Sequence, residues 1–537
     1  MEHLTPSQKE VVDECLAKGS GGLSLPMGSG KTLISLVVSL TLSPVDPILV
    51  VVPKTLLTGW VHEMNKFLQV PYEILHPEYT DVRTWTVSDI TRVVLSTTQT
   101  LTKFYREYGI ENHFVYRVPN EAVGYTNLFQ TPEHPLLSSV LVTRGGGTVY
   151  TRTWGALVVD EAHGCCNILV DKCRCIAAVC ARHRWLLSGT MFSEPKPANL
   201  LGYYVMIGHP ENPGSLSQMT MWMRRAGFPG VRPTLVYRDE VVRDYEVETE
   251  VIETPLTEEE ATFYRMGRDI LSQIGRELEQ TADTNRRRRY SAYLLAMITY
   301  LRQTLIAPII VLASIALDIC KIEERSHLSE IINTQLQEAG LGAWLNDPAS
   351  ICSSRLGRVL RSLEEDVPDR RVVLFSAFRT SLRLLQHFIK NRPVFDLPVS
   401  ASSERRQEIL TSFASSKGGV LLLTYRMGAE GLNLQCSDTV FLLDTMWNST
   451  SASQAIARVA RQGQLSEKVK VKIFVGNTGM EKAILEKQII KNEIGKQIMT
   501  GPTRQRYHQM RVKDVLRLVE AEANGTLCRY SIEQSIV

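Results

Sequence analysis

The chain has 537 residues, of which 44% are hydrophobic, and its 60 Lys and Arg residues nearly balance its 57 Asp and Glu residues. A chain of this length is too long for one ordinary hydrophobic core, so we expect roughly two to four domains. Its apolar content is sufficient for large buried sheets. The formal charge of +3 neither supports nor excludes nucleic acid, because a local basic track would suffice. No apolar run approaches the ~20 residues of a membrane span, and the opening MEHLTPSQKE lacks a basic-then-apolar secretory signal. We therefore expect a soluble, intracellular protein, in the nucleus or the cytoplasm.

A glycine-rich turn is the first motif along the chain. Met27–Thr32 reads MGSGKT, and the apolar LISLVVSL after it predicts a helix. Such a turn directs backbone N–H groups and the positive helix end at phosphates. Lys31 would reach the β- and γ-phosphates, and Thr32 would place its hydroxyl on Mg²⁺. Leu25 replaces the first Gly of the full GxxxxGKT pattern, so a chance Gly-Lys-Thr turn is the alternative.

Short, β-branched apolar runs predict the strands of a first lobe. ILVVV occupies 48–52 and ALVV occupies 156–159, and runs of this length suit strands buried on both faces of a parallel sheet. Helical stretches separate them, as in βαβ units. The segment 102–150 contains three consecutive glycines, Gly145, Gly146 and Gly147, and several prolines. It is expected to be a surface insertion.

Two carboxylates follow the strand at 156–159. Asp160-Glu161-Ala162-His163 would lie at the ligand-binding edge of a parallel sheet. Asp160 is expected to hold Mg²⁺ through water, and Glu161 to orient and activate the attacking water. A solvated helix start with two acids is the alternative. Ser188-Gly189-Thr190 ends the next apolar run, where small hydroxyl residues can sense the γ-phosphate and couple it to a bound polymer, although a plain turn would look the same.

Half of the ten cysteines crowd into the stretch between these two motifs, at Cys165, Cys166, Cys173, Cys175 and Cys180. Zinc is one interpretation, but no CxxC pair is present and the spacing suits a buried helix flank better. Reduced thiols are therefore expected.

The stretch from about residue 190 to about 371 lacks strand-like runs and is expected to be mostly helical. Thr257 followed three residues later by Glu260 is a capping-box signature for a helix start. The run Arg286–Arg289 falls in this stretch. It is either a phosphate-binding surface or a solvated helix end.

A second set of apolar runs, VVLF at 372–375, VLLL at 420–423 and TVFLL at 439–443, predicts a second lobe. VKVKIFV at 469–475 alternates apolar and basic residues, so it is expected at a sheet edge. Gln454, Arg458 and Arg461 are spaced i, i+4 and i+7, which predicts one helical face. Two arginines on that face could enter a phosphate site from across a cleft, as arginine fingers do. A basic, solvated face is the alternative.

These motifs belong to a longer ordered set that covers most of the chain. The set comprises LTPSQ (4–8), MGSGKT (27–32), ILVVVPKTLLTGWVHEMNKF (48–67), VVLSTTQTL (93–101), VVDEAH (158–163), LLSGT (186–190), PLTEEEATFY (255–264), LRQTLIAP (301–308), SSRLGRVLRSLEE (353–365), VVLFSAF (372–378), ERRQEILTSF (404–413), GAEGLNLQCSDTVFLLDTMWN (428–448) and QAIARVARQGQ (454–464). In order and spacing the chain resembles the Swi/Snf-type family of superfamily-two helicase-like ATPases.

The resemblance implies an α/β protein of two RecA-like lobes, each a parallel sheet covered by helices, with ATP and Mg²⁺ in the cleft. The expected domains are a first lobe over 1–254 with the 102–150 insertion, a helical insertion and linker over 255–350, a second lobe over 351–495 and a basic extension over 496–537. The resemblance implies that Gln8 contacts adenine. The expected nucleotide-binding residues are Gln8, Met27, Gly28, Ser29, Gly30, Lys31, Thr32, Gly431 and Gln454, and the expected catalytic residues are Lys31, Asp160, Glu161, Arg458 and Arg461.

The resemblance also implies a motor that moves along double-stranded DNA, with single-stranded DNA or RNA less expected. Loops at strand ends, rich in hydroxyls and backbone N–H groups, would hold phosphates without reading sequence. The expected nucleic-acid residues are Lys54, Thr97, Thr98, Asn433 and Trp447, of which Trp447 could instead pack the lobe.

Three residues depart from the family pattern, because Met191, Glu194 and Ser449 stand where Pro, Asn and Pro are usual. They put the strength of DNA coupling in doubt more than ATP hydrolysis. The alternatives are a strand-separating helicase, a transcription-linked nucleoside triphosphatase of the compact viral kind, or a DNA-binding scaffold without enzymatic activity. The complete set of catalytic residues argues against the scaffold.

Overall fold

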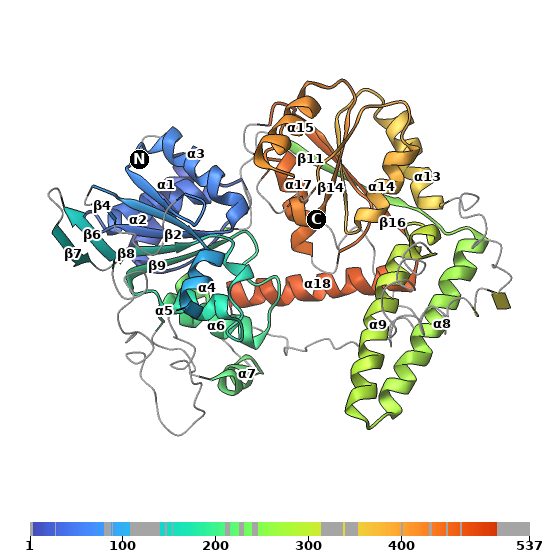
Figure 1. Ribbon diagram of the computed structural model, residues 1–537, viewed down its shortest axis with the longest axis horizontal. Coiled ribbons are helices and arrows are strands. Elements are labelled where there is room, and N and C mark those ends of the chain that lie inside the picture. Colours follow the sequence, from blue (N-terminus) through green and yellow to red (C-terminus); the bar gives the residue numbers. More distant parts are fainter. Residues whose placement is uncertain are drawn as a thin grey trace. The chain divides into compact units, whose positions relative to one another are not determined.

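The chain forms two compact units, Met1–Val242 with Lys491–His508, and Arg243–Ile490 with Gln509–Val537. In the computed structural model, each unit has a parallel sheet with helices packed on it (Figure 1). The structure describes residues 4–26, 28–79, 87–88, 90–107, 140–144, 148–152, 154–209, 215–224, 230–238, 245–312, 334, 337–338, 353–398, 401–428, 432–446, 449–461 and 464–501.

The first unit contains a seven-stranded parallel sheet in the order β10-β1-β9-β8-β2-β5-β3. Every residue of β2, β5 and β8 is buried, which explains their continuous apolar sequences. The strand bounds are β1 Gly21–Ser24, β2 Ile48–Val52, β3 Tyr72–Leu75, β5 Val93–Thr97, β8 Trp154–Val159, β9 Ala181–Ser188 and β10 Leu235–Tyr237.

Helices cover both faces of this sheet, and alternate residues of β2 contribute to two separate hydrophobic clusters. On one face lie α1 (Pro6–Lys18), α2 (Lys31–Leu42) and α3 (Leu57–Phe67). On the other face lie α4 (Thr98–Glu107), α5 (Asp171–Ala178), α6 (Pro197–Ile207) and α7 (Leu216–Arg224). The sheet is therefore the middle layer of three.

The second unit contains a six-stranded parallel sheet in the order β11-β16-β15-β12-β14-β13. Helices α13 and α14 pack on one face of the sheet, and α15 and α17 pack on the other. Two parallel sheets covered by helices confirm the predicted fold class. The bounds are β11 Glu246–Glu253, β12 Val372–Ser376, β13 Val394–Asp396, β14 Val420–Thr424, β15 Thr439–Leu442, β16 Lys468–Val475, α13 Ser354–Arg361, α14 Arg379–Phe388, α15 Ser403–Ser415, α16 Tyr425–Gly428 and α17 Ser449–Val459. Helix α18 (Gly479–Thr500) begins in this unit, and its residues from Lys491 onward belong to the first unit.

The expected edge strand at 469–475 is wrong, because β16 lies between β11 and β15. The outer strand β11 carries glutamates opposite the lysines of β16, so that Lys468 pairs with Glu246 at 3.1 Å and Lys472 with Glu250 at 3.0 Å. Cross-strand pairs of opposite charge stabilise a sheet. The alternating lysines of β16 are therefore explained by the glutamates of β11, which lie opposite them.

Strands also occur where none were expected, since β10 and β11 fall within the stretch from 190 to 371. The expected first lobe ran to residue 254, but β11 joins the sheet of the second unit. A small sheet of β4 (Val87–Ser88), β6 (Val140–Arg144) and β7 (Thr148–Arg152) includes the end of the expected insertion. Gly145–Gly147 lie outside the described residues, and the expected C-terminal extension is described only to Gly501.

A helical hairpin of α8 (Glu258–Gln280) and α9 (Thr284–Thr304) follows β11 (Figure 1). Thr257 and Glu260 form the predicted capping box at the start of α8. Apolar side chains of the two helices pack together in one cluster, which also contains Met480 and Ile484 of α18, and this burial explains why α8 and α9 pair. Within the described residues, no helix combines the length and apolar character needed to cross a membrane.

Candidate active site

Three neighbouring strands of the first unit bring the predicted motifs to one edge of the sheet. Strands β1, β9 and β8 lie side by side and run parallel. The glycine-rich turn follows β1, Ser188 ends β9, and Asp160 follows β8. Because carboxyl ends of parallel strands meet at one edge, and ligands bind there in α/β sheets, this edge is the candidate site.

The glycine-rich turn has the conformation of a phosphate cradle. Gly28 and Gly30 both adopt a φ of +81°, which favours glycine. Gly30 is the N-cap of α2 and has no side chain that could cap the helix, and a helix N-terminus of this kind suits an anion. Lys31 begins α2, and its Nζ donates to the carbonyl oxygens of Leu25 and Pro26 at 3.0 Å each. Thr32 follows on α2, and Met27 lies outside the described residues.

Gln8 links the start of α1 to the glycine-rich turn. Its Oε1 accepts a hydrogen bond from the N–H of Thr5 at 3.0 Å, and its Nε2 donates to the carbonyl oxygen of Ser29 at 3.0 Å. A Cβ on Gly30 would come within 2.5 Å of the same Nε2. The amide of Gln8 therefore holds the turn in place, and its contact with adenine stays a prediction.

Asp160 is buried at the end of β8 and is held by two N–H donors. Its Oδ2 accepts from Trp60 Nε1 at 2.8 Å, and its Oδ1 accepts from the backbone N–H of Glu161 at 2.8 Å. Burial and the neighbouring Glu161 charge raise the pKa of Asp160 to about 6, although Trp60 and Lys31 act in the opposite direction. A cation beside a buried carboxylate with a raised pKa stabilises the charged form of that carboxylate.

Glu161 adopts a left-handed φ of +48° at the turn after β8, a conformation that non-glycine residues seldom take. The turn brings Oε2 of Glu161 to 3.3 Å from Nδ1 of His163, and the same ring nitrogen lies 3.0 Å from Oγ of Ser188. Ser188 Oγ also accepts from the N–H of Thr190 at 3.0 Å. His163 thus lies between the carboxylate of Glu161 and the hydroxyl of Ser188, and Gly189 separates Ser188 from Thr190 in the sequence.

The residues of this edge fit a polyphosphate with a divalent cation. Lys31 and the start of α2 supply positive charge and N–H donors, and Asp160 and Glu161 supply carboxylate oxygens. The hydroxyls of Ser29 and Thr190 are buried without a hydrogen-bond partner among the described residues. Buried polar groups are normally paired, so these hydroxyls are suited to a bound ligand.

The second unit holds the remaining predicted site residues, and one geometric expectation about them is wrong. Helix α17 ends at Val459, so Arg461 lies beyond the helix and does not share its face with Gln454 and Arg458. Gln454 and Arg458 are both buried, and Arg458 Nε donates to the carbonyl oxygen of Gly428 at 2.6 Å. Gly431 lies outside the described residues. The i, i+7 spacing failed because the helix stops before it reaches the second arginine.

The residues expected to contact nucleic acid differ in accessibility. Lys54 is about half exposed and forms an ion pair with Glu78, and Asn433 is exposed. Thr97 is fully buried and its Oγ1 accepts from the N–H of Thr100, so it caps α4 and does not reach the surface in this conformation. Thr98 is also buried, and Trp447 lies outside the described residues.

Trp60 is a site residue that sequence reasoning missed. It lies within the quoted run 48–67, but nothing in the local sequence indicates a contact with a carboxylate 100 positions later. Only the packing of α3 beside the end of β8 shows the contact.

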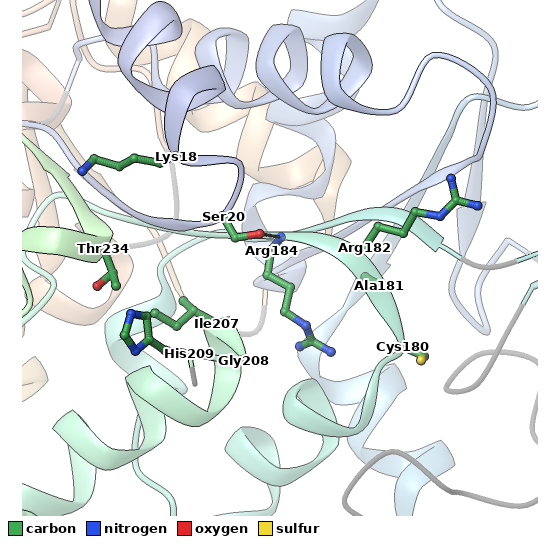
Figure 2. Close-up of a pocket in the computed structure, with 10 residues that line it drawn as sticks. All are labelled: Lys18, Ser20, Cys180, Ala181, Arg182, Arg184, Ile207, Gly208, His209 and Thr234. Atoms are coloured by element: carbon green, nitrogen blue, oxygen red, sulfur yellow. Dashed lines mark hydrogen bonds between the residues drawn. The ribbon is translucent and has the colours of Figure 1, made fainter. Parts of the chain in front are cut away.

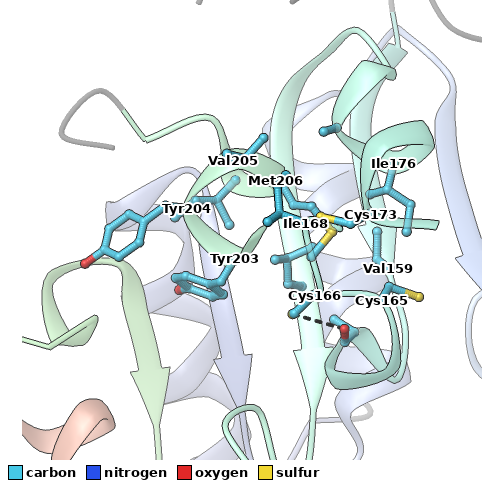
Figure 3. Close-up of a cluster of buried hydrophobic side chains, with 14 of the residues drawn as sticks. Val159, Cys165, Cys166, Ile168, Cys173, Ile176, Tyr203, Tyr204, Val205 and Met206 are labelled. Carbon is cyan, nitrogen blue, oxygen red and sulfur yellow. Dashed lines mark hydrogen bonds between the residues drawn. The ribbon is translucent and has the colours of Figure 1, made fainter. Parts of the chain in front are cut away.

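The cysteine-rich stretch is part of the core rather than of the site. Cys165, Cys166, Cys173 and Cys175 are buried among apolar side chains of α5 and α6 (Figure 3). Burial raises the pKa of Cys165 to about 11, which keeps the thiol protonated. Across the described residues, no group of three His, Cys, Asp or Glu side chains could hold a metal ion.

A pocket of about 410 Å³ lies at the opposite edge of the sheet, where β1 and β9 begin (Figure 2). It is lined by several basic side chains, but their donors already have acceptors. Arg184 donates to the carbonyl oxygens of Met206 and Val179, and Lys18 to that of Pro233. The basic side chains of this pocket therefore serve the local fold, and the predicted motifs lie at the other edge of the sheet.

The chain is similar to known proteins in two of its segments. Residues 14–243 match the SNF2-related domain, and residues 354–463 match the Helicase conserved C-terminal domain. The DNA repair protein RAD5 of Yarrowia lipolytica is 28% identical over 151 residues, which are 28% of this chain and 14% of that protein. The chain spans only 14% to 17% of the length of the RAD5 proteins of three yeasts and fungi.

Two further comparisons extend over most of the chain. The putative helicase 172L of Invertebrate iridescent virus 6 is 24% identical over 555 residues, covering 90% of this chain and 85% of that protein. The crystal structure of the Pyrococcus furiosus Hef helicase domain covers 90% of this chain and 98% of its own, with a TM-score of 0.53 and 16% identity. That likeness concerns the fold, and it agrees with two RecA-like lobes.

Proposed function

The chain belongs to the Swi/Snf-type family of superfamily-two helicase-like ATPases, and from this membership we propose that it hydrolyses ATP to move along double-stranded DNA. The arrangement of Lys31, Asp160 and Glu161 at one sheet edge carries the proposal. A basic residue at a helix N-terminus beside two carboxylates suits phosphoryl transfer to water.

The residues of the first unit take distinct roles in this proposal. Lys31 and the N–H groups of α2 bind the phosphates, and Gln8 keeps the glycine-rich turn in position. Thr32 and Asp160 would hold Mg²⁺, which neutralises the charge of the phosphates when bound. Glu161 orients a water molecule and accepts its proton at a carboxylate oxygen as the water attacks the terminal phosphorus, whose bond to the bridging oxygen breaks so that ADP leaves.

The second unit is proposed to complete the site in the cleft between the lobes. Arg458 and Arg461 would stabilise negative charge on the transferring phosphoryl group, with Gln454 and Gly431 beside the nucleotide. The support is the family match of residues 354–463, which contains all four. The buried hydrogen bond of Arg458 to Gly428 indicates that this arginine also holds the local fold.

Double-stranded DNA is the proposed track, and phosphate contacts would position the protein without reading sequence. Several relatives are named DNA repair proteins. The exposed Lys54 and Asn433 remain the best-placed of the described candidates for such contacts. Ser188, Gly189 and Thr190 would couple the nucleotide to the track, because Ser188 is joined to Glu161 through His163.

ATPase rates with no nucleic acid, single-stranded DNA, duplex DNA and RNA test the proposal. We expect duplex DNA to stimulate most, a triplex-displacement assay to report movement, and a forked duplex to release little single strand. Glu161→Gln serves as the inactive control in each assay. Equal stimulation by single strands together with robust unwinding would overturn the duplex translocase.

A strand-separating helicase or a compact viral nucleoside triphosphatase is the second candidate. The observation that favours it is the alignment over 90% of this chain with a putative helicase of a virus. Strand separation needs a platform or wedge that holds unpaired bases. The forked-duplex assay separates the two candidates, since only this one requires strand release.

A further inference from the structure

The indole of Trp60 holds one oxygen of the Asp160 carboxylate. Trp60 lies on α3 and is 2% exposed, and its Nε1 donates to Oδ2 of Asp160 at 2.8 Å. The other oxygen accepts the backbone N–H of Glu161 at 2.8 Å. With one donor on each oxygen, the plane of the carboxylate is fixed at two points.

The bond is not a general requirement of packing in this core. Trp185 belongs to the same hydrophobic cluster as Trp60 and is equally buried. Its indole Nε1 has no hydrogen-bond partner among the described residues. The cluster therefore tolerates an indole without a partner, and the hydrogen bond of Trp60 is specific to Asp160.

The two residues come from neighbouring βα units. Strands β2 and β8 pair in parallel, and the N–H of Asp160 donates to the carbonyl oxygen of Val51 at 2.9 Å. Helix α3 follows β2 after the short turn Lys54–Leu56. The helix after one strand thus orients the carboxylate at the end of the neighbouring strand, so that regular secondary structure positions both partners.

We propose that Trp60 is a positioning residue for the divalent cation, because its indole N–H holds the Asp160 carboxylate in one orientation. This inference rests on the proposed function, since it takes Asp160 as the carboxylate that holds Mg²⁺. Groups that hydrogen-bond to metal-binding side chains are typically worth about 10- to 100-fold in metal affinity or activity. Loss of the N–H alone should therefore lower the affinity of the site for the cation. It should leave the binding of phosphates by the glycine-rich turn unchanged.

Trp60→Phe and Trp185→Phe in the full chain form a matched pair. Both replace a buried indole of one cluster with a smaller ring, but only Trp60→Phe removes a hydrogen bond to Asp160. The affinity for a fluorescent ATP analogue is measured over graded Mg²⁺ and in EDTA, and Mn²⁺ binding with ADP is followed by electron paramagnetic resonance. We expect Trp60→Phe to need about 10-fold more cation, with unchanged affinity in EDTA, and Trp185→Phe to resemble the wild type.

Equal cation requirements in the two variants would overturn the inference and leave Trp60 as a packing residue. A wild-type chain without cation-dependent nucleotide binding would instead overturn the proposed function, so the two failures are distinct. If Trp60→Phe does not fold, benzothienylalanine at position 60 keeps the shape of the ring system and lacks the N–H. It should show the same higher cation requirement, and a wild-type requirement would contradict the inference.

Discussion

The Nε of Arg458 donates a hydrogen bond to the carbonyl oxygen of Gly428 at 2.6 Å. The carbonyl of Arg458 in turn accepts the N–H of Leu434 at 3.1 Å. Arg458 is 8% exposed, so it joins α17 to the end of α16 from a buried position. Arg458 and Arg461 therefore differ in their structural roles, because Arg458 lies in α17 and Arg461 lies beyond its end.

We predict that Arg458→Ala lowers both thermal stability and ATP turnover. A buried acceptor that loses its donor costs about 1–3 kcal/mol.

Arg461→Ala should lower turnover with little change in the unfolding temperature, since arginine fingers act in the transition state and are worth ~10³–10⁵ in rate. Thermal unfolding and steady-state ATPase rates measure both, with the exposed Arg405→Ala as control. Unchanged turnover in Arg461→Ala would show that its side chain serves only the local structure.

Lys31→Ala should abolish turnover in a protein that still folds. The Nζ of Lys31 contacts two carbonyl oxygens of the turn and no hydrophobic cluster depends on it, while the bound phosphates lose their point charge. ATPase rate and circular dichroism check the result against Lys9→Ala, an exposed lysine of α1. Near-normal hydrolysis by a folded Lys31→Ala protein would contradict the site assignment.

Glu161→Gln should bind ATP and barely hydrolyse it. The amide keeps the size of the side chain, but it cannot accept a proton. Equilibrium binding of a fluorescent ATP analogue and single-turnover hydrolysis separate the two effects, with the exposed Glu259→Gln as control. Loss of ATP binding in Glu161→Gln would mean that Glu161 is structural.

Replacing Arg286–Arg289 by Gln should weaken binding to duplex DNA without destabilising α9. All four arginines are exposed in the first turns of α9, where positive charge opposes the helix dipole. If they bind DNA phosphates, the slope of log affinity against log salt becomes shallower by about 0.9 for each phosphate that the variant no longer neutralises. Replacing all four by Lys is the control and should preserve most of the slope. An unchanged slope in the Gln variant would favour a solvated helix end.

Local patterns were sufficient for much of the fold and for the first-lobe motifs. ILVVV at 48–52 became β2 with every residue buried, and Thr257 with Glu260 formed the predicted capping box. The glycine-rich turn and Asp160 followed their strands as expected. These features depend on neighbours in sequence, through side-chain burial, backbone conformation and capping. The strands, the turn and the chemical character of the sheet edge were therefore predictable from local sequence patterns.

Which distant segments meet depends on how the strands and helices pack in three dimensions. The lysines of β16 indicated an edge strand until β11, more than 200 positions earlier, supplied the facing glutamates. Helix α17 ended before Arg461 although the spacing favoured a longer helix. Trp60 reached Asp160 because α3 packs beside the end of β8. Such pairings depend on strand order and helix packing, and the periodicity of a single segment contains no information about its partner.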